Sequence, residues 1–205
     1  MANPPVAANV VDLRYDTPGR QDVFLVDSNV WYWTTYSLAT LANRQPETYQ
    51  TSDYPDYIKR CLDAGARLTR TPTALAEVAS RIAHTEYEAY CRHHPFVIQK
   101  AYRSIRAERR NVVRQILTSC RQIQDSSECI SAPADEQLER ESLVALAFAS
   151  LDLADAMMLV TARHQNIRQV ITDDGDFATV SGVTIFTANG RVIREARRAG
   201  RLRTR

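Results

Sequence analysis

Four acidic residues of this chain have the chemistry and the spacing to bind divalent metal ions together. They are Asp27, Glu77, Asp155 and Asp174. Carboxylates held a few ångströms apart resist ionisation, and a divalent cation removes that penalty. Hard oxygen ligands of this kind suit Mg²⁺ or Mn²⁺. A metal-bound water attacks a phosphodiester, and the ion offsets the charge that develops on the phosphate oxygens. The four acids therefore predict metal-dependent phosphodiester hydrolysis, provided that the fold brings them together.

The elements that must position these acids can be predicted from the apolar pattern of the sequence. Short apolar runs, each the length of a buried strand, lie at 23–26, 66–71, 169–172 and 183–186. Longer amphipathic segments separate them, and this alternation indicates an α/β fold with a central, mainly parallel sheet flanked by helices. In such sheets ligands bind beyond the carboxyl ends of the strands. Asp27 and Asp174 both follow a predicted strand.

The predicted helices bring the other two acids toward the same edge. Glu77 lies about a turn and a half into a helix that starts at Pro72. Asp155 falls in the first turn of a helix over 153–165, with Asp152 as its N-cap. Taken singly, each acid is equally well explained as a helix cap, a surface charge or a solvated turn. Their shared position at one sheet edge is what favours a site.

Four segments around these acids follow one another in a recognisable order. They are FLVDSNVW at 24–31, TPTALAEVA at 71–79, LDLADAMMLVTA at 151–162 and VITDDGDF at 170–177. Together with SGVTIFTAN at 181–189, they resemble the PIN-domain family of metal-dependent ribonucleases, which includes many toxins of toxin–antitoxin pairs. The resemblance implies a three-layer PIN-like fold with its core at about 22–84 and 136–189.

The same resemblance implies roles for individual residues. Asp27, Glu77, Asp155 and Asp174 become the catalytic metal ligands of an endoribonuclease that uses Mg²⁺ or Mn²⁺. Asp176 becomes an accessory metal ligand that matters less than Asp174, while Asn29 and Thr172 support the site. Asp173 is expected to point outward.

The steps from Asp27 to Glu77 and from Glu77 to Asp155 are longer than in the compact toxins of the family. We expect residues 86–135 to form a helical insertion packed on the core, with one long helix over about 96–123. Seven Lys and Arg lie at 100–121 and seven at 191–205, so these two segments hold 14 of the 26 in the chain. Such basic faces attract a phosphate backbone, although solvated surfaces explain either segment equally well. The residues predicted to bind RNA are Lys100, Arg103, Arg106 and Arg110.

The remaining segments carry weaker signals. Residues 1–21 are expected to form an irregular arm, 43–56 a loop, 57–64 a short helix and 190–205 a basic tail. The aromatic residues that follow the first predicted strand, Trp31, Trp33 and Tyr36, suit the core better than a base-stacking surface. The four Cys show no metal-binding spacing. With no signal peptide and no bilayer-length apolar stretch, the sequence favours a cytoplasmic protein with reduced thiols and no membrane segment.

The function predicted from the sequence is therefore a divalent-metal-dependent endoribonuclease, in one interpretation the toxin of a toxin–antitoxin pair. RNA is the expected partner, and the resemblance adds an antitoxin protein and a homodimer. The alternative is a non-catalytic PIN-like protein that binds RNA or regulates an assembly. An aspartyl-phosphate phosphatase is disfavoured, because Asn29 occupies the position where that chemistry needs a second Asp.

Overall fold

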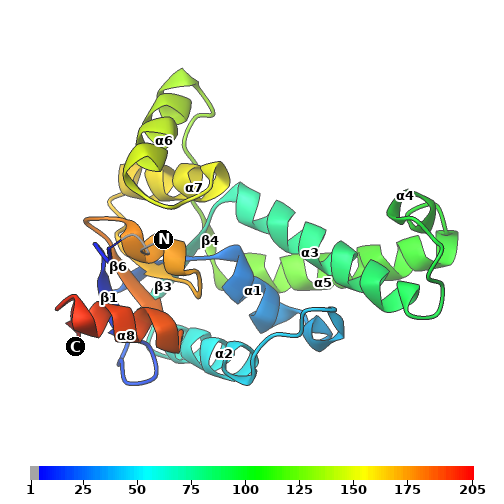
Figure 1. Ribbon diagram of the computed structural model, residues 1–205, viewed down its shortest axis with the longest axis horizontal. Helices are drawn as coiled ribbons and strands as arrows, with labels where there is room; N and C mark the ends of the chain where they lie inside the picture. Colours follow the sequence, from blue (N-terminus) through cyan, green and yellow to red (C-terminus); the bar gives the residue numbers. More distant parts are fainter. Residues whose placement is uncertain (1–4) are drawn as a thin grey trace.

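A parallel sheet lies in the left-hand part of the protein as drawn in Figure 1. The computed structural model describes residues 5–205, so the part of the predicted N-terminal arm at 1–4 lies outside the described residues. Within the described part, seven strands lie in the order β4-β3-β2-β5-β6-β1-β7, and every neighbouring pair is parallel. The strands are β1 (Asn9–Asp12), β2 (Val23–Val26), β3 (Arg67–Arg70), β4 (Glu128–Cys129), β5 (Gln169–Ile171), β6 (Thr184–Thr187) and β7 (Leu202–Arg203).

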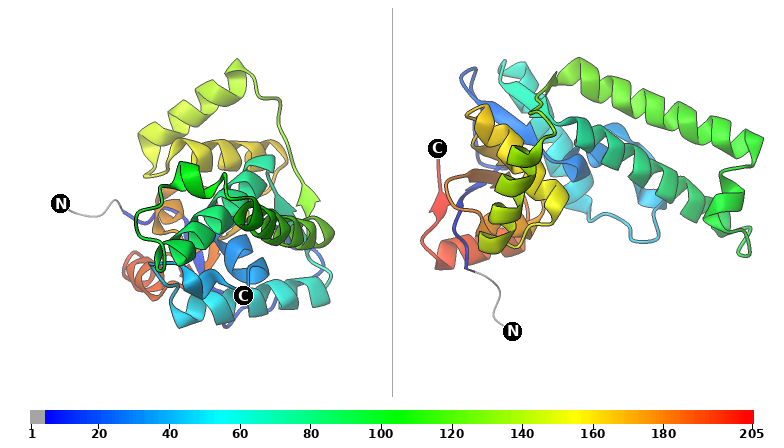
Figure 2. Two further views of the ribbon diagram at one scale, coloured as in Figure 1. Left: turned by 90° about the vertical axis from the view of Figure 1, so that its right-hand side faces the viewer. Right: turned by 90° about the horizontal axis from the view of Figure 1, so that it is seen from above.

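Helices cover both faces of the sheet, which confirms the predicted α/β class with its three layers (Figures 1 and 2). The helices are α1 (Ser28–Thr35), α2 (Thr48–Asp63), α3 (Pro72–Cys91), α4 (Gln99–Tyr102), α5 (Arg106–Ser126), α6 (Glu136–Phe148), α7 (Leu153–His164) and α8 (Gly190–Arg198). Short 3-10 helices lie at Ala39–Leu41 and Gly175–Thr179.

Side chains alternate across the sheet, so each strand contributes to two cores. Phe24 and Val26 of β2 pack in a core with α1, α2 and α3, whereas Leu25 packs on the opposite face with α7 and α8. Trp31 and Tyr36 are buried in the first of these cores, as predicted, and Trp33 is packed against it. Burial of both sheet faces explains why the strands appear as continuous apolar runs.

The sheet extends beyond the predicted core at both ends of the sequence. The expectation of an irregular arm over 1–21 is wrong for residues 9–12, because β1 pairs in parallel with β6 and its Val10 and Val11 are buried on opposite faces. The basic tail at 190–205 is likewise ordered as α8 and β7. Helix α8 buries one face through Val192, Ile193 and Ala196. This apolar face is hard to recognise in the sequence because arginines are so frequent in the segment.

The predicted loop over 43–56 is partly wrong, because α2 already begins at Thr48. Its start is stabilised by Gln50, whose side chain accepts a hydrogen bond from the Glu47 backbone N–H at 2.8 Å. Pro55 lies inside the helix. We attribute the tolerance of this proline, which removes one backbone donor, to the burial of Tyr54 and Tyr57 on either side of it.

Residues 86–126 form a projection that we call the helical arm: the last six residues of α3, then α4, then α5 (Figure 2). The single helix predicted over 96–123 is interrupted between Tyr102 and Arg106, and Ile98, expected in its apolar stripe, is 66% exposed. Helix α5 returns toward the sheet, where Ile123 joins the core and the Ser119 hydroxyl donates to the Thr35 carbonyl at 3.1 Å. The arm is thus continuous with the core at one end.

No single helix among residues 5–205 is long and apolar enough to cross a membrane. Only α6 and α7 taken together meet that criterion by length and composition, and a bend of 113° separates them. All four Cys have free thiols.

Candidate metal centre

Asp27 links the central strand β2 to α1. It is the N-cap of α1, and its carboxylate is buried, with only 2% of the residue exposed. Oδ1 accepts a hydrogen bond from the Ser28 hydroxyl at 3.2 Å, and Oδ2 accepts one from the Asn29 amide at 3.4 Å. These donors are neutral, so they orient the carboxylate without neutralising its charge.

Thr172 connects Asp27 to Asp174. Its hydroxyl donates to Asp27 Oδ2 at 2.8 Å and accepts a hydrogen bond from the Asp174 backbone N–H at 2.9 Å. Because β2 and β5 are neighbours in the sheet, the residues that follow them meet at its carboxyl edge. The threonine, which is completely buried, therefore fixes the relative position of two predicted metal ligands.

The other two acids come from helices that begin near the same edge. Glu77 lies in the second turn of α3, and Asp155 lies in the first turn of α7, where its backbone N–H donates to Asp152 at 2.9 Å. Asp27, Glu77, Asp155 and Asp174 all line one cavity of about 490 Å³. Asp152, Asn29, Ser80 and Arg81 are among the other lining residues. The structure thus brings together the four acids that the sequence singled out.

The electrostatics of this cavity, which we call the acid cavity, are unfavourable for carboxylates. Burial raises the pKa of Asp27 to about 6; the hydrogen bond from Thr172 opposes this rise, and the charge of Asp174 adds to it. Burial also raises the pKa of Asp155 to about 8, with further contributions from the negative charges of Asp27, Asp152, Asp174 and Glu77. The charges of the other three acids therefore all contribute to the raised pKa of Asp155.

The turn after β5 differs from its prediction. Asp173 does not point outward: it is partly buried, and its carboxylate accepts hydrogen bonds from Tyr54 at 2.8 Å and from Tyr49 and Gln50 of α2. The helix that supplies Tyr49, Gln50 and Tyr54 begins at Thr48, nine residues before its predicted start at residue 57. Asp176 is exposed and is absent from the lining of the acid cavity, and its backbone N–H donates to Oδ1 of Asp174, the N-cap of the 3-10 helix, at 2.8 Å.

Arg81 was not singled out from the sequence. It lies one turn after Glu77 on α3 and lines both the acid cavity and a neighbouring cavity of about 760 Å³. Its charge lowers the pKa of Asp27 but is only a minor contribution there. The i, i+4 spacing from Glu77, which places the two side chains on one helix face, was the signal that could have found it.

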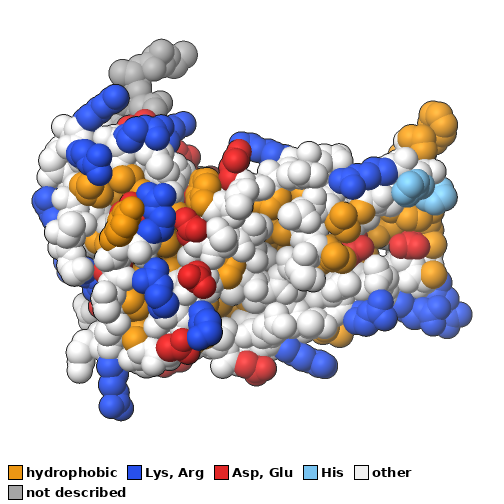
Figure 3. All heavy atoms as spheres, turned by 90° about the horizontal axis from the view of Figure 1, so that it is seen from below, with side chains coloured by type: hydrophobic (Ala, Val, Ile, Leu, Met, Phe, Trp, Pro, Cys, Tyr) orange, Lys and Arg blue, Asp and Glu red, His pale blue; other side chains and the backbone are white. Residues whose placement is uncertain are grey.

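The residues predicted to bind RNA lie far from the acid cavity. Lys100 and Arg103 are at α4, and Arg106 and Arg110 are at the start of α5, all exposed at the outer end of the helical arm (Figures 1 and 3). At about 1.5 Å per residue, the axis of α3 runs roughly 21 Å from Glu77 to Cys91, where the arm turns. The structure does not bring this basic cluster next to the acids.

Among residues 5–205, no three carboxylate, thiol or imidazole side chains stand close enough together to enclose a metal ion as they are. The acids line the walls of a shared cavity, and their oxygen donors are of the type that hard divalent cations prefer. Comparisons with models of known protein families and with curated protein sequences find no match to this chain.

Proposed function

We propose that this protein is a divalent-metal-dependent ribonuclease that hydrolyses phosphodiester bonds at the acid cavity. The observation that carries the proposal is that four acids from separate segments, Asp27, Glu77, Asp155 and Asp174, line one cavity at the carboxyl edge of the sheet. A structural role for these acids would normally bring each a cationic partner. Within the described residues, none of the four forms an ion pair with a Lys, Arg or His.

The donor set fits Mg²⁺ or Mn²⁺. The acid cavity offers carboxylate and amide oxygens, which suit a hard cation. Asp27, Glu77, Asp155 and Asp174 would hold the ion, with Asp176 outside the cavity as at most an accessory ligand. When bound, such an ion supplies an acidified water and stabilises charge on the phosphate oxygens.

The chain's own residues prepare the site for this chemistry. Thr172 and Ser28 hold the Asp27 carboxylate in one orientation before any ligand arrives. Preorganisation of this kind avoids a reorganisation cost during the reaction. Arg81, at the border of the acid cavity, places a positive charge where the substrate phosphate approaches. Burial and, after it, the negative charges of neighbouring acids raise the pKa of Asp155, and a bound cation would offset both.

RNA as the substrate is supported by the resemblance described above and by the concentration of Arg and Lys at both ends of the molecule (Figure 3). The toxin role, the antitoxin partner, the homodimer and a cytoplasmic location remain predictions from the sequence. A non-catalytic RNA-binding protein is the alternative that the experiment below separates from the enzyme.

The test is cleavage of a labelled single-stranded RNA with Mg²⁺ or Mn²⁺, repeated with EDTA. We expect cleavage that EDTA abolishes and that Asp174→Asn reduces strongly. The matched control is Asp125→Asn, which makes the same chemical change at an exposed residue of α5. Metal-independent cleavage, or RNA binding with no cleavage under any of these conditions, would contradict the proposal.

A further inference from the structure

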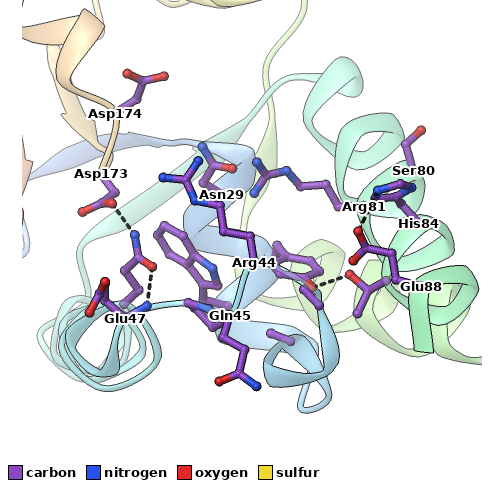
Figure 4. A pocket seen from close by; sticks show the side chains of 17 residues that line it. Asn29, Arg44, Gln45, Glu47, Ser80, Arg81, His84, Glu88, Asp173 and Asp174 are labelled. Carbon is purple, nitrogen blue, oxygen red and sulfur yellow. Dashed lines mark hydrogen bonds and ion pairs between the residues drawn. The ribbon is translucent and has the colours of Figure 1, made fainter. Parts of the chain in front are cut away.

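The cavity of about 760 Å³ that adjoins the acid cavity is the strongest remaining candidate for a binding site (Figure 4). It lies between α1, the loop before α2, and α3, and we call it the side cavity. Asn29, Ser80, Arg81 and Asp174 line both cavities, so the two are continuous. A ligand that occupies the side cavity would therefore extend directly into the acid cavity.

Two arginines project into this space from opposite sides. Arg44 comes from the loop before α2 and Arg81 from α3, and both extend toward Asn29 (Figure 4). Within the described residues neither has a carboxylate within the 4.0 Å of an ion pair. Arg81 contacts only a ring face, with its Cζ 5.8 Å from the centre of Tyr32. Both guanidinium groups are therefore available to a ligand.

Two of the four acids that line the side cavity, Glu88 and Asp173, are engaged by other groups. Glu88 binds His84 at 3.2 Å and accepts a hydrogen bond from the Asn43 backbone N–H at 2.9 Å. Asp173 is held by Tyr49, Gln50 and Tyr54. Glu47 and Asp174 complete the acidic lining, and Arg44 and Arg81 are the two basic side chains of the lining that form no ion pair within residues 5–205. Two free guanidinium groups suit an anionic ligand that makes bidentate contacts.

Two further groups indicate that this ligand is a nucleotide chain. Trp33, only partly buried, contributes an aromatic side chain to the wall, and aromatic rings bind unpaired bases by stacking. Asn29 Oδ1 is buried without a hydrogen-bond partner, so it can accept a hydrogen bond from a ligand. Phosphate-binding arginines, a stacking ring and an unsatisfied acceptor together match the groups of a single-stranded nucleic acid.

We propose that the side cavity binds the nucleotides flanking the cleaved bond of a single-stranded RNA, with Arg81 and Arg44 on successive phosphates and Trp33 against a base. The inference rests on the proposed function, because it takes the acid cavity as the place of cleavage. It also assigns substrate binding to residues close to the acids rather than to the basic cluster at the end of the helical arm.

The experiment measures binding of a labelled six-nucleotide single-stranded RNA by fluorescence anisotropy with Mg²⁺, in full-length protein carrying Asp27→Asn to prevent cleavage. We expect Arg44→Gln and Arg81→Gln each to weaken binding by about tenfold, the size expected for loss of a hydrogen-bonded charge contact. Each should also make the salt dependence shallower by about 0.7 in the log–log slope. The matched control is Arg168→Gln, an exposed arginine just before β5, at the opposite edge of the sheet.

Tryptophan fluorescence gives a second readout. The chain has two Trp, and Trp31 is only 1% exposed, so quenching by RNA reports mainly on Trp33. We expect quenching that Trp33→Phe removes while the anisotropy change persists. The inference would be overturned by arginine variants that bind RNA as tightly as the Arg168→Gln control, or by quenching that survives in Trp33→Phe. It would also be overturned if the short RNA did not bind at all. That last result is expected if the cavity binds a protein segment instead.

The same variants in the otherwise wild-type protein separate this inference from the proposed function. If the inference is right, Arg44→Gln raises KM for the short RNA about tenfold and leaves kcat nearly unchanged. If the protein does not cleave RNA but the arginine variants still bind weakly, the proposed function fails and the binding site stands. Normal cleavage with an unchanged KM in both arginine variants would overturn the binding site and leave the function intact.

Discussion

Two buried aspartates, Asp16 and Asp27, are each 2% exposed, yet their surroundings differ in one respect. The Asp16 carboxylate accepts hydrogen bonds from Arg205 Nε at 2.7 Å and from the Tyr57 hydroxyl at 2.6 Å. Arg205 also donates a hydrogen bond to Asp22 at 2.6 Å. Asp27 receives hydrogen bonds only from neutral groups. One acidic cluster therefore has a cation paired with its carboxylates, whereas in the acid cavity Arg81 lines the wall but forms no ion pair with an acid.

The difference is the one expected between a cluster that stabilises the fold and a candidate functional site. Burial alone would raise the pKa of Asp22, but hydrogen bonds from Arg205 and Gly19 bring it below its ordinary value. Arg205 also lies over the ring of Phe186, with its Cζ 4.7 Å from the ring centre, and so ties β7 to the sheet core. In the acid cavity the pKa values of Asp27 and Asp155 are instead raised. Unrelieved burial of this kind is typical of binding and catalytic sites.

The largest expected effect distinguishes the two aspartates by activity. Asp27→Asn should reduce single-turnover cleavage of RNA by at least about 10³-fold, because it removes a proposed metal ligand that would act only on the chemical step. RNA affinity should change little, since binding depends on arginines that this substitution leaves in place. Asp16→Asn should leave the cleavage rate of the folded protein unchanged. The measurement is single-turnover kinetics at saturating RNA, with folding of each variant checked by circular dichroism.

The comparison would fail if Asp27→Asn cleaved at the wild-type rate in preparations free of contaminating nuclease. It would also fail if Asp16→Asn, folded and at a permissive temperature, lost activity to the same extent.

The next effect concerns stability. Arg205→Gln should lower the free energy of unfolding by roughly 2–4 kcal/mol, because it leaves the Asp16 carboxylate, whose side chain is fully buried, without a cation. For a chain of this length that corresponds to about 5–15 °C in Tm. Arg203→Gln is the matched control, since Arg203 is exposed and donates only to backbone carbonyls. Equal melting temperatures for the two variants would show that Arg205 does not stabilise the fold.

A third effect tests whether the acid cavity accepts a cation from solution. Mn²⁺ or Mg²⁺ should raise the Tm of the wild-type protein, with a gain of about 2.7 kcal/mol at a hundredfold excess over Kd. The shift should disappear in Asp27→Asn and persist in Asp16→Asn, as measured by differential scanning fluorimetry against an EDTA reference. The same shift in all three proteins would place the ion outside the acid cavity.

The acid cavity was largely predictable from the sequence because its residues lie beside strong local signals. Asp27 and Asp174 follow apolar strands, and Asp155 follows a helix cap, so the rule that sites form at the carboxyl edge of parallel strands was enough to group them. Glu77 followed from the position of Pro72 at the start of α3. In each case a short segment determines the helix or strand, and the sheet topology then places the acid at the shared carboxyl edge.

The Arg205 cluster and the side cavity were not predictable by the same reasoning. Arg205 meets Asp16 across 189 positions of the sequence, and nothing in its surroundings distinguishes it from the other arginines of the segment. Arg44 lies in a loop whose course depends on where α2 begins, and α2 begins earlier than its Pro55 suggested. The hydrogen bonds that hold Asp173 come from the same early part of α2. Contacts made by loops and by chain segments far apart in sequence depend on tertiary packing, which periodicity does not record.

The smallest effect is expected to have opposite signs in the two acidic clusters. Asp155 has a pKa raised to about 8, above its ordinary value near 3.8, so its ionisation opposes folding. The stability of the metal-free protein should therefore fall as pH rises between about 4 and 8. Asp155→Asn removes this penalty and should stabilise the EDTA-treated protein at pH 8 by on the order of 1 kcal/mol, roughly 2–4 °C in Tm, with a smaller gain at pH 5.

The pKa of Asp22 is lowered, so its ionised form supports folding, and Asp22→Asn should instead lower the Tm at both pH values. Thermal melts of the three proteins with EDTA at pH 5 and pH 8 measure both signs. If Asp155→Asn melted below wild type at pH 8, the Asp155 carboxylate would stabilise the fold. The contrast between the Arg205 cluster, whose acids are paired with a cation, and the acid cavity, whose acids are not, would then be lost.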